Sequence, residues 1–171
     1  MRELADVDRI RAFMRALGAA ADVDGAAYLT GGATAVLHGW RGTTVDVDVL
    51  LVPESDGLLR AIAGLKDDLR LNVELVSPAD FIPVPPGWEN RSLFAAREGR
   101  LTFYHYDPYA QALAKVERGH AKDLVDVRAL VDSGLVNPVR ARALFDEIEP
   151  QLYRYPALDA RAFRAAVEEA F

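Results

Sequence analysis

The apolar residues of this chain recur with two spacings, every three to four residues and every second residue, which predict helices and strands respectively. The helical spacing covers residues 6–18 and 58–69, and a shorter helix is expected at 33–38. Strand-like segments, several of them rich in β-branched residues, lie at 26–30, 45–52, 71–76 and 101–106. The first hundred residues therefore predict a sheet with helices between its strands.

From residue 107 onward the pattern becomes helical, with helices expected near 108–118, 120–132, 138–149 and 159–170. The preceding stretch 77–87 contains four prolines and is expected to be an irregular loop. This order predicts an α/β or α+β sheet domain at 1–106 and a C-terminal helical part at 107–171 packed on it. A single domain with one shared core is the alternative interpretation.

Composition narrows the class of protein. The 171 residues are 51% hydrophobic, which is enough for a proper core. Disulfides, thiolate zinc sites and cysteine nucleophiles are excluded because the sequence contains no cysteine. The first residues alternate charged and apolar side chains, unlike a signal peptide or a membrane span. We therefore expect a cytoplasmic protein without a membrane partner.

The charge pattern bears on partners. A net charge of −6 argues against a protein that coats nucleic acid with its whole surface. Residues 91–122 nevertheless carry more basic than acidic side chains, which favours an anionic partner there, although a mixed solvated surface is the alternative. These basic residues are Arg91, Arg97, Arg100, Lys115, Arg118 and Lys122.

The predicted strand 45–52 carries the clearest chemical signal. Side chains alternate between the two faces of a strand, so Asp46 and Asp48 project from the same face while the intervening valines point to the core. Two carboxylates this close repel each other unless a cation lies between them. Oxygen ligands of this kind suit Mg²⁺ or Mn²⁺ and, through the ion, substrate phosphates. A half-exposed strand with an acidic outer face is the alternative interpretation.

Three further features lie near this strand in the sequence. The Gly31-Gly32 turn joins a predicted strand to a short helix, and glycines let a phosphate approach the backbone, although most such turns are only turns. Arg41 and Thr44, just before the strand, carry a guanidinium and a hydroxyl that suit phosphate oxygens. A surface ion pair for Arg41 and a plain strand-entry role for Thr44 are the alternatives.

Glu74 is a candidate third acid in the predicted strand 71–76. Apolar residues flank it, so its side chain is expected to leave the core face as Asp46 and Asp48 do. If the two strands are neighbours, three carboxylates converge, which suits two bridged ions and a base toward an attacking hydroxyl. An exposed strand glutamate without a function is the alternative.

Together, the glycine turn, the short helix, Asp46-x-Asp48 and the later acid resemble the nucleotidyltransferase superfamily of the DNA polymerase β type. The strings GGATAVLHGWRGTTVDVDVLL and ALAKVERGHAKDLVD resemble small bacterial nucleotidyltransferases related to abortive-infection toxins. The similarity covers roughly residues 26–132. It implies an α+β fold, in which a nucleotidyltransferase-type mixed β-sheet is flanked by helices and followed by a C-terminal helical part. It also implies that the glycine turn binds a triphosphate and that the three acids hold two divalent ions.

The resemblance further implies that Lys115 reaches the nucleotide phosphates and that Asp123 fixes the rear wall of the site. Taken alone, Lys115 reads as a solvated lysine on an apolar-faced helix, and Asp123 as an acid favoured by the start of a helix. Two features depart from the family pattern. Gly32 stands where serine is common, so that hydroxyl is missing, and the third acid is glutamate where aspartate is commoner.

The expected activity is transfer of a nucleotide from a nucleoside triphosphate to a hydroxyl acceptor, with Mg²⁺ or Mn²⁺ on Asp46, Asp48 and Glu74. By resemblance the acceptor is RNA, including a tRNA end, or a protein hydroxyl, and the protein is one partner of a toxin–antitoxin pair. A weak or inactive nucleotide-binding module in such a pair is the main alternative. A metal-dependent glycosyltransferase is a third interpretation, and the glycine turn upstream of the acids argues against it.

Other chemistry has weaker support. The three histidines, His38, His105 and His120, lack metal-ligand spacing, and His38 is interpreted as a cap or a packing residue. Trp40 and Trp88 lie in predicted loops, where either could line a substrate pocket.

Overall fold

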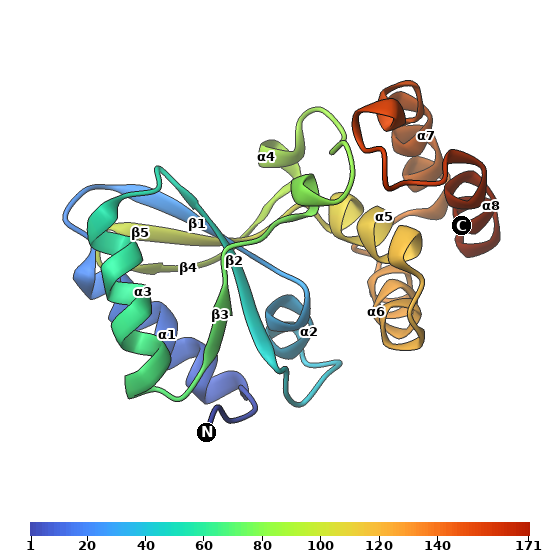
Figure 1. Ribbon diagram of the computed structural model, residues 1–171. Coiled ribbons are helices and arrows are strands. Elements are labelled where there is room, and N and C mark those ends of the chain that lie inside the picture. The colour runs from blue at the N-terminus through green and yellow to red at the C-terminus, as the bar shows by residue number, and fades with distance from the viewer. The chain divides into compact units, whose positions relative to one another are not determined.

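The acidic strand lies near the middle of a five-stranded sheet in the computed structural model, which describes residues 1–171 (Figure 1). The strand order is β3-β2-β1-β5-β4, and parallel and antiparallel pairs are mixed: β1–β5 and β2–β3 are parallel, while β1–β2 and β4–β5 are antiparallel. The predicted α+β class with a mixed sheet is confirmed. The strands are β1 Gly25–Thr30, β2 Asp46–Val52, β3 Asn72–Glu74, β4 Leu93–Glu98 and β5 Leu101–His105.

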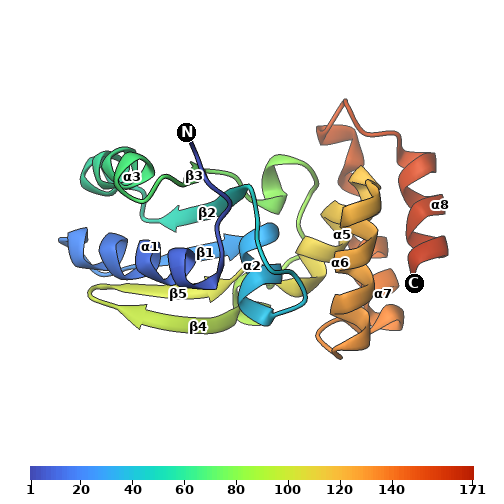
Figure 2. The same cartoon turned by 90° about the horizontal axis from the view of Figure 1, so that it is seen from below.

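Three helices supply the apolar side chains that cover one face of this sheet: α1 Val7–Ala20, α2 Gly32–His38 and α3 Asp56–Asp68. Figure 2 shows α1 and α3 on the same side of the strands. The side chains of Asp6 and Ser55 cap α1 and α3 by accepting main-chain hydrogen bonds, so polar residues define where both helices begin. Phe13 of α1 and Val47 and Val49 of β2 are fully buried in the core beneath them.

Strand β4 and several short helices were not expected from the sequence. The segment Leu93–Glu98 pairs with β5 at the edge of the sheet, with an irregular register between Phe94 and Ala96. That irregularity and the exposure of Phe94 break the alternation by which a strand is recognised. Within the proline-rich stretch 77–87, Pro78–Asp80 forms a 3-10 helix (η1). Directly after it, Trp88–Arg91 forms α4, so Trp88 lies in a short helix and not in the expected loop.

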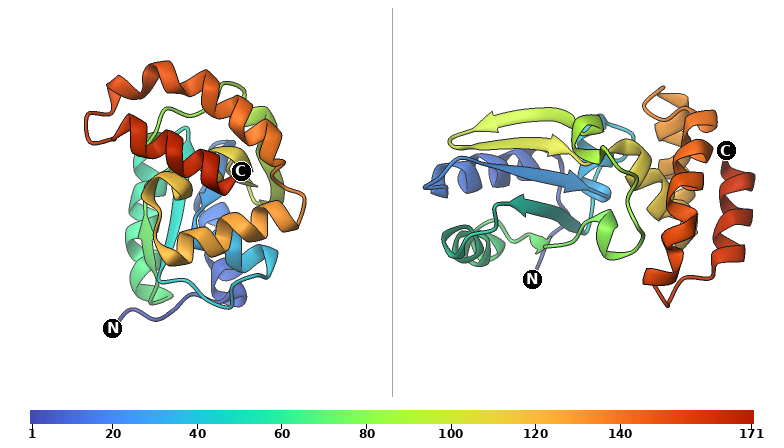
Figure 3. Two further views of the ribbon diagram at one scale, coloured as in Figure 1. Left: turned by 90° about the vertical axis from the view of Figure 1, so that its right-hand side faces the viewer. Right: turned by 90° about the horizontal axis from the view of Figure 1, so that it is seen from above.

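A second group of helices has its own core: α5 Pro108–Arg118, α6 Ala121–Asp132, α7 Pro138–Ile148 and α8 Ala160–Ala170, with a 3-10 helix (η2) at Glu149–Arg154. Figure 3 shows them in gold to red. Ile82, from the proline-rich stretch, packs into this core with Leu113 and Phe145, and Trp88 stacks on Tyr106 with ring centroids 4.4 Å apart. The proline-rich stretch thus belongs with the helices that follow it.

The chain divides into two compact units. The first unit contains Met1–Ser77 and Ser92–His105, and the second contains Pro78–Arg91 and Tyr106–Phe171. Compared with the expected division after residue 106, the second unit also includes the stretch 78–91. None of the helices combines the length and the apolar character that crossing a membrane requires.

Candidate functional site

The two aspartates of β2 leave the core side of the sheet together. Val47 and Val49 are fully buried, whereas Asp46 and Asp48 are only partly buried, so the valines and the aspartates occupy opposite faces. This is the arrangement that the alternating pattern predicted.

Glu74 lies next to Asp48 on the neighbouring strand. Strands β2 and β3 are parallel, and their register pairs Asp48 with Glu74 and Asp46 with Asn72. The side-chain amide of Asn72 donates to Asp46 Oδ1 and lies 3.5 Å from Glu74 Oε1. The expected neighbourhood of the two acidic strands is therefore present, and an amide that the sequence analysis did not single out lies between two of the acids.

The glycine turn lies directly against Asp48. Gly31 has φ 62° and ψ −131°, a conformation that side chains other than hydrogen disfavour. A Cβ atom at this position would lie 2.8 Å from Asp48 Oδ2. Any larger residue at position 31 would therefore intrude on the space around this carboxylate.

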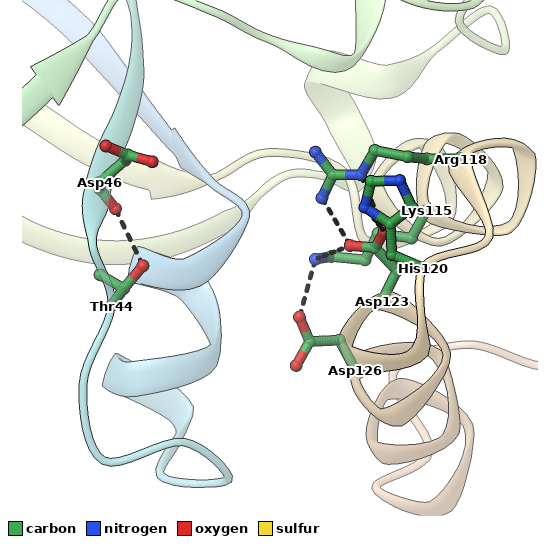
Figure 4. A network of polar contacts seen from close by, with 7 residues as sticks. All are labelled: Thr44, Asp46, Lys115, Arg118, His120, Asp123 and Asp126. Atoms are coloured by element: carbon green, nitrogen blue, oxygen red, sulfur yellow. Dashed lines mark hydrogen bonds and ion pairs between the residues drawn. The ribbon is translucent and has the colours of Figure 1, made fainter.

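Thr44 fills the space that a side chain at position 32 would take. A Cβ atom on Gly32 would lie 1.9 Å from Thr44 Oγ1 and 3.1 Å from Arg41 Nη1. The Thr44 hydroxyl also donates to the main-chain oxygen of Asp46 at 3.1 Å (Figure 4). A hydroxyl and a guanidinium thus meet at Gly32, and both groups bind phosphate oxygens in proteins. The serine hydroxyl that is missing at position 32 has a counterpart close by in Thr44.

The N-terminal segment fastens the beginnings of both acidic strands. Ala5 and Thr44 exchange two main-chain hydrogen bonds of 2.8 and 2.9 Å, and the amide of Glu3 donates to the carbonyl of Arg70 at 2.8 Å. Thr44 lies just before β2 and Arg70 just before β3. The strands that carry Asp46 and Glu74 are therefore held at the same ends by one short segment.

These side chains match the donor set of a hard divalent cation without forming a closed cage. Carboxylate oxygens are the ligands that Mg²⁺ and Mn²⁺ prefer, and Asp46 and Asp48 present them from one face of one strand. No group of three or more acidic, histidine or cysteine side chains is close enough to hold an ion by itself. Protein sites for Mg²⁺ commonly use one or two carboxylates and complete the coordination with substrate phosphates and water. The two aspartates fit that pattern.

Lys115 and Asp123 lie in the second unit, within a buried network of charges. The ammonium of Lys115 is 2.7 Å from Asp126 Oδ2 and 3.8 Å from Asp123 Oδ1, and its side chain is only 9% exposed (Figure 4). Arg118 donates two hydrogen bonds to Asp123. The solvated-lysine interpretation of Lys115 is therefore wrong. Its role toward a nucleotide stays a prediction.

Asp123 is ionised within this network. Burial alone would raise the pKa of Asp123, but the hydrogen bonds and charge of Arg118, together with the charge of Lys115, outweigh it and hold the pKa below its ordinary value. Asp123 also lies in the first turn of α6, as its alternative interpretation supposed.

The comparison with protein families adds direct evidence on what the chain is. Residues 5–169 match the family described as nucleotidyltransferase of unknown function (DUF6036). The chain belongs to this nucleotidyltransferase family. No curated protein and no solved structure shows a significant match. The match spans both units, so the helical second unit is as much a part of this family of nucleotidyltransferases as the sheet.

Two polar residues of these clusters were missed in the sequence. Asn72 stands two residues before Glu74 on the same strand face, and Asp126 stands three residues after Asp123 on the same helix. Both spacings place the missed residue beside a candidate that had been recognised. In each case the spacing was the signal.

Proposed function

We propose that this nucleotidyltransferase is an active, metal-dependent enzyme that transfers a nucleotide from a nucleoside triphosphate to a hydroxyl acceptor. The observation that carries the proposal is the position of the Asp48 carboxylate beside Gly31, where a Cβ atom would lie 2.8 Å from Asp48 Oδ2. The same strand face also presents Asp46. A turn that can accept phosphate oxygens thus lies against the carboxylates that suit the ion. Membership in the family supplies the reaction class.

In this proposal Asp46 and Asp48 hold Mg²⁺ or Mn²⁺, with Glu74 as the third acid. The bound ions neutralise charge on the transferred phosphoryl group and on the leaving pyrophosphate. Arg41, Thr44 and the Gly31-Gly32 backbone bind the non-reacting phosphates, and Asn72 orients Asp46. Lys115 is assigned to the phosphates and Asp123 to the rear wall by resemblance to the polymerase β type.

The proposed reaction is a single displacement at the α-phosphorus. The acceptor oxygen forms a bond to the α-phosphorus while the bond from that phosphorus to the oxygen bridging to the β-phosphate breaks, so pyrophosphate leaves. The acceptor proton passes to a carboxylate, for which Glu74 is the candidate because it lies beside Asp48 and is exposed.

The test is label transfer. The purified protein is incubated with each α-³²P nucleoside triphosphate, Mg²⁺ and either total tRNA or a protein extract, and labelled products are separated on gels. Asp46→Asn and Asp48→Asn are each expected to reduce transfer by about 100-fold or more, because a charge-stabilising ion is lost. Asp68→Asn, an exposed acid of the same unit, is the matched control and is expected to leave transfer unchanged. Equal transfer by wild type and Asp46→Asn would overturn the assignment of the metal site.

Which of the two acceptors carries the label decides between RNA and protein. A role in a toxin–antitoxin pair, as in the abortive-infection relatives, predicts that expression arrests growth, that Asp46→Asn does not, and that a neighbouring gene product relieves the arrest. Arrest that persists with Asp46→Asn would refute this link.

A nucleotide-binding partner without transferase activity is the second candidate. Two observations favour it: the Asn72 amide already occupies one oxygen of Asp46, and no closed cluster of three acids forms. It predicts Mg²⁺-dependent binding of a nucleoside triphosphate by calorimetry, with no label on either acceptor. Transfer to either acceptor would exclude it.

A further inference from the structure

The first unit contains a cavity of about 380 Å³ that none of the proposed catalytic residues lines. Its walls come from α1, the end of α2, β4 and the end of β5. On β5, His105 lies on the same face as Phe103, which is buried in the core beneath the helices. On β2, Val47 lies on this core face. Asp46 and Asp48 point away from that core. The cavity therefore lies on the opposite face of the sheet from the two carboxylates.

Two arginines of α1 line the cavity. Arg11 and Arg15 stand one helical turn apart, are exposed, and form no hydrogen bond or ion pair within the protein. Like charges at this spacing destabilise a helix. In contrast, Arg97 and Arg100 of the same unit both pair with Asp24. Two neighbouring guanidinium groups without a protein partner can donate hydrogen bonds to the oxygens of a phosphate.

Two histidines, far apart in the sequence, form another wall. The ring centroids of His38 and His105 are 4.3 Å apart, and Trp40 stacks on His38 with centroids 5.2 Å apart. The Thr34 hydroxyl donates to the carbonyl of Leu29 at 3.3 Å and lies 3.2 Å from His105 Nδ1. A neutral imidazole carries a donor on one ring nitrogen and an acceptor on the other.

Burial favours the neutral form of both rings. Burial lowers the pKa of His105 to about 4, with a smaller contribution from His38, and burial also lowers the pKa of His38. Neutral imidazoles present one donor and one acceptor each, which suits the edge of a nucleobase better than a second anion.

The lining combines charged and imidazole side chains with six apolar ones, which are Met14, Leu37, Leu93, Phe94, Ala95 and Ala96. Glu98 is the one carboxylate among the lining residues, so two arginines and one glutamate leave a net charge of +1. The volume is in the range of small-molecule sites, roughly 300–1,000 Å³.

From this geometry we infer that the cavity binds a nucleoside monophosphate, with its phosphate on Arg11 and Arg15 and its base against His38 and His105. The site is separate from the proposed transfer site, and the inference does not depend on catalysis.

Binding is measured by isothermal titration with AMP, GMP, CMP and UMP in EDTA, so that no divalent ion occupies the aspartates. At least one is expected to bind saturably with a Kd below about 1 mM. The Arg11→Gln/Arg15→Gln variant is expected to raise that Kd about tenfold or more, whereas Glu98→Gln lowers it by removing the opposing charge. Arg60→Gln, an exposed arginine outside the cavity, leaves it unchanged.

Separate arms test the two halves of the ligand. The parent nucleoside is expected to compete poorly and inorganic phosphate weakly. Equal competition by phosphate would overturn the base contact, and equal binding by the double-arginine variant would overturn the phosphate contact. Absence of binding by all four nucleotides would refute the site outright. Asp46→Asn retains this binding while losing label transfer, so failure of either proposal is distinguishable from failure of the other.

Discussion

The buried acids of the second unit and Asp46 of the first unit differ in what neutralises their charge. In the second unit, Asp123 and Asp126 are each within 3 Å of a cationic group, from Arg118 and Lys115, and both are almost completely buried. In the first unit, Asp46 is more exposed, and its carboxylate accepts from the amide of Asn72 and has no cationic side chain within 4 Å. The protein neutralises Asp123 and Asp126, whereas Asp46 is arranged so that a cation from outside can neutralise it.

This difference separates structural from chemical roles. A buried charge without its partner is costly, so the charges of the second unit are expected to hold α5 to α6. Asp46 has no such ion pair, so its carboxylate is expected to contribute little to stability and to serve binding. Removing members of each set tests the contrast directly.

The largest effect is expected from breaking the buried network. Lys115→Met removes the ammonium that lies 2.7 Å from the buried carboxylate of Asp126. It should lower the free energy of unfolding by about 3–5 kcal/mol. Asp46→Asn should change it by less than about 1 kcal/mol. Urea denaturation, followed by the fluorescence of Trp88 in a Trp40→Phe background, reports on the second unit.

The control for that experiment removes both partners. Lys115→Met/Asp126→Leu replaces the ion pair by apolar side chains and is expected to recover most of the lost stability. A Lys115→Met variant as stable as the wild type would contradict a structural role for the pair.

The next largest effect is expected from a change in the packing of the Gly31-Gly32 turn. Gly32→Ser places a side chain on Thr44 and is expected to cost about 1–3 kcal/mol of stability and most of the transferase activity. Thr44→Gly in the same chain removes both clashing atoms, because Thr44 Cβ would also lie 2.6 Å from the new Cβ. The double variant should then regain thermal stability and part of the activity. No recovery would show that the contact is not the cause.

A smaller effect is expected at the amide between the acids. Asn72→Ala frees the carboxylate of Asp46 to rotate and should weaken the apparent affinity for Mg²⁺, or the rate, by about 10- to 100-fold. The Mg²⁺ concentration that gives half-maximal label transfer measures this effect. Asn72→Asp should also shift that midpoint, because the aspartate does not restore the hydrogen bond. An unchanged midpoint in Asn72→Ala would rule out an orienting role.

The smallest effect is a pH dependence of the second unit. The folded-state pKa of Asp123 is lowered, so its contribution to stability is fully present above the unfolded value of about 3.9 and is lost as pH falls through the folded value. Arg118→Gln raises the folded pKa and should flatten this loss. The free energy of unfolding is measured between pH 5 and pH 2 for the wild type and for Arg118→Gln. An equal dependence on pH in the two proteins would contradict the role of Arg118 in lowering the pKa of Asp123.

Regular patterns made most of the fold predictable. The alternation of β2 and the apolar spacing in α1 follow from local physics, so these elements were predicted close to their observed bounds. Strand β4 was missed because its register is irregular and its exposed Phe94 conceals the alternation. The membership of the stretch 78–91 depends on tertiary packing of Ile82, which no local pattern encodes.

For the site, the spacing of residues in the sequence predicted which side chains of one strand or helix lie together. It did not predict which strands and helices lie next to each other. Asp46 and Asp48 share a face because they stand two residues apart on one strand. That Glu74 lies beside them depends on the pairing of β3 with β2, which the sequence does not give. The meeting of Thr44 with Gly32, and of His38 with His105, joins residues from separate segments and could not be predicted from spacing.

The hydrogen bonds of residues 3–5 to Thr44 and Arg70 should couple the motions of two strands. Because residues 3–5 bond to the entrances of both acidic strands, a local opening of this segment would release β2 and β3 together. The amides of Glu3, Ala5 and Thr44 should then exchange with deuterium at a common rate. Shortening the chain to begin at residue 6 would raise exchange along both strands and allow Asp46 and Glu74 to move relative to each other. Affinity tags are therefore better placed at the C-terminal end when the chemistry of the acids is to be measured.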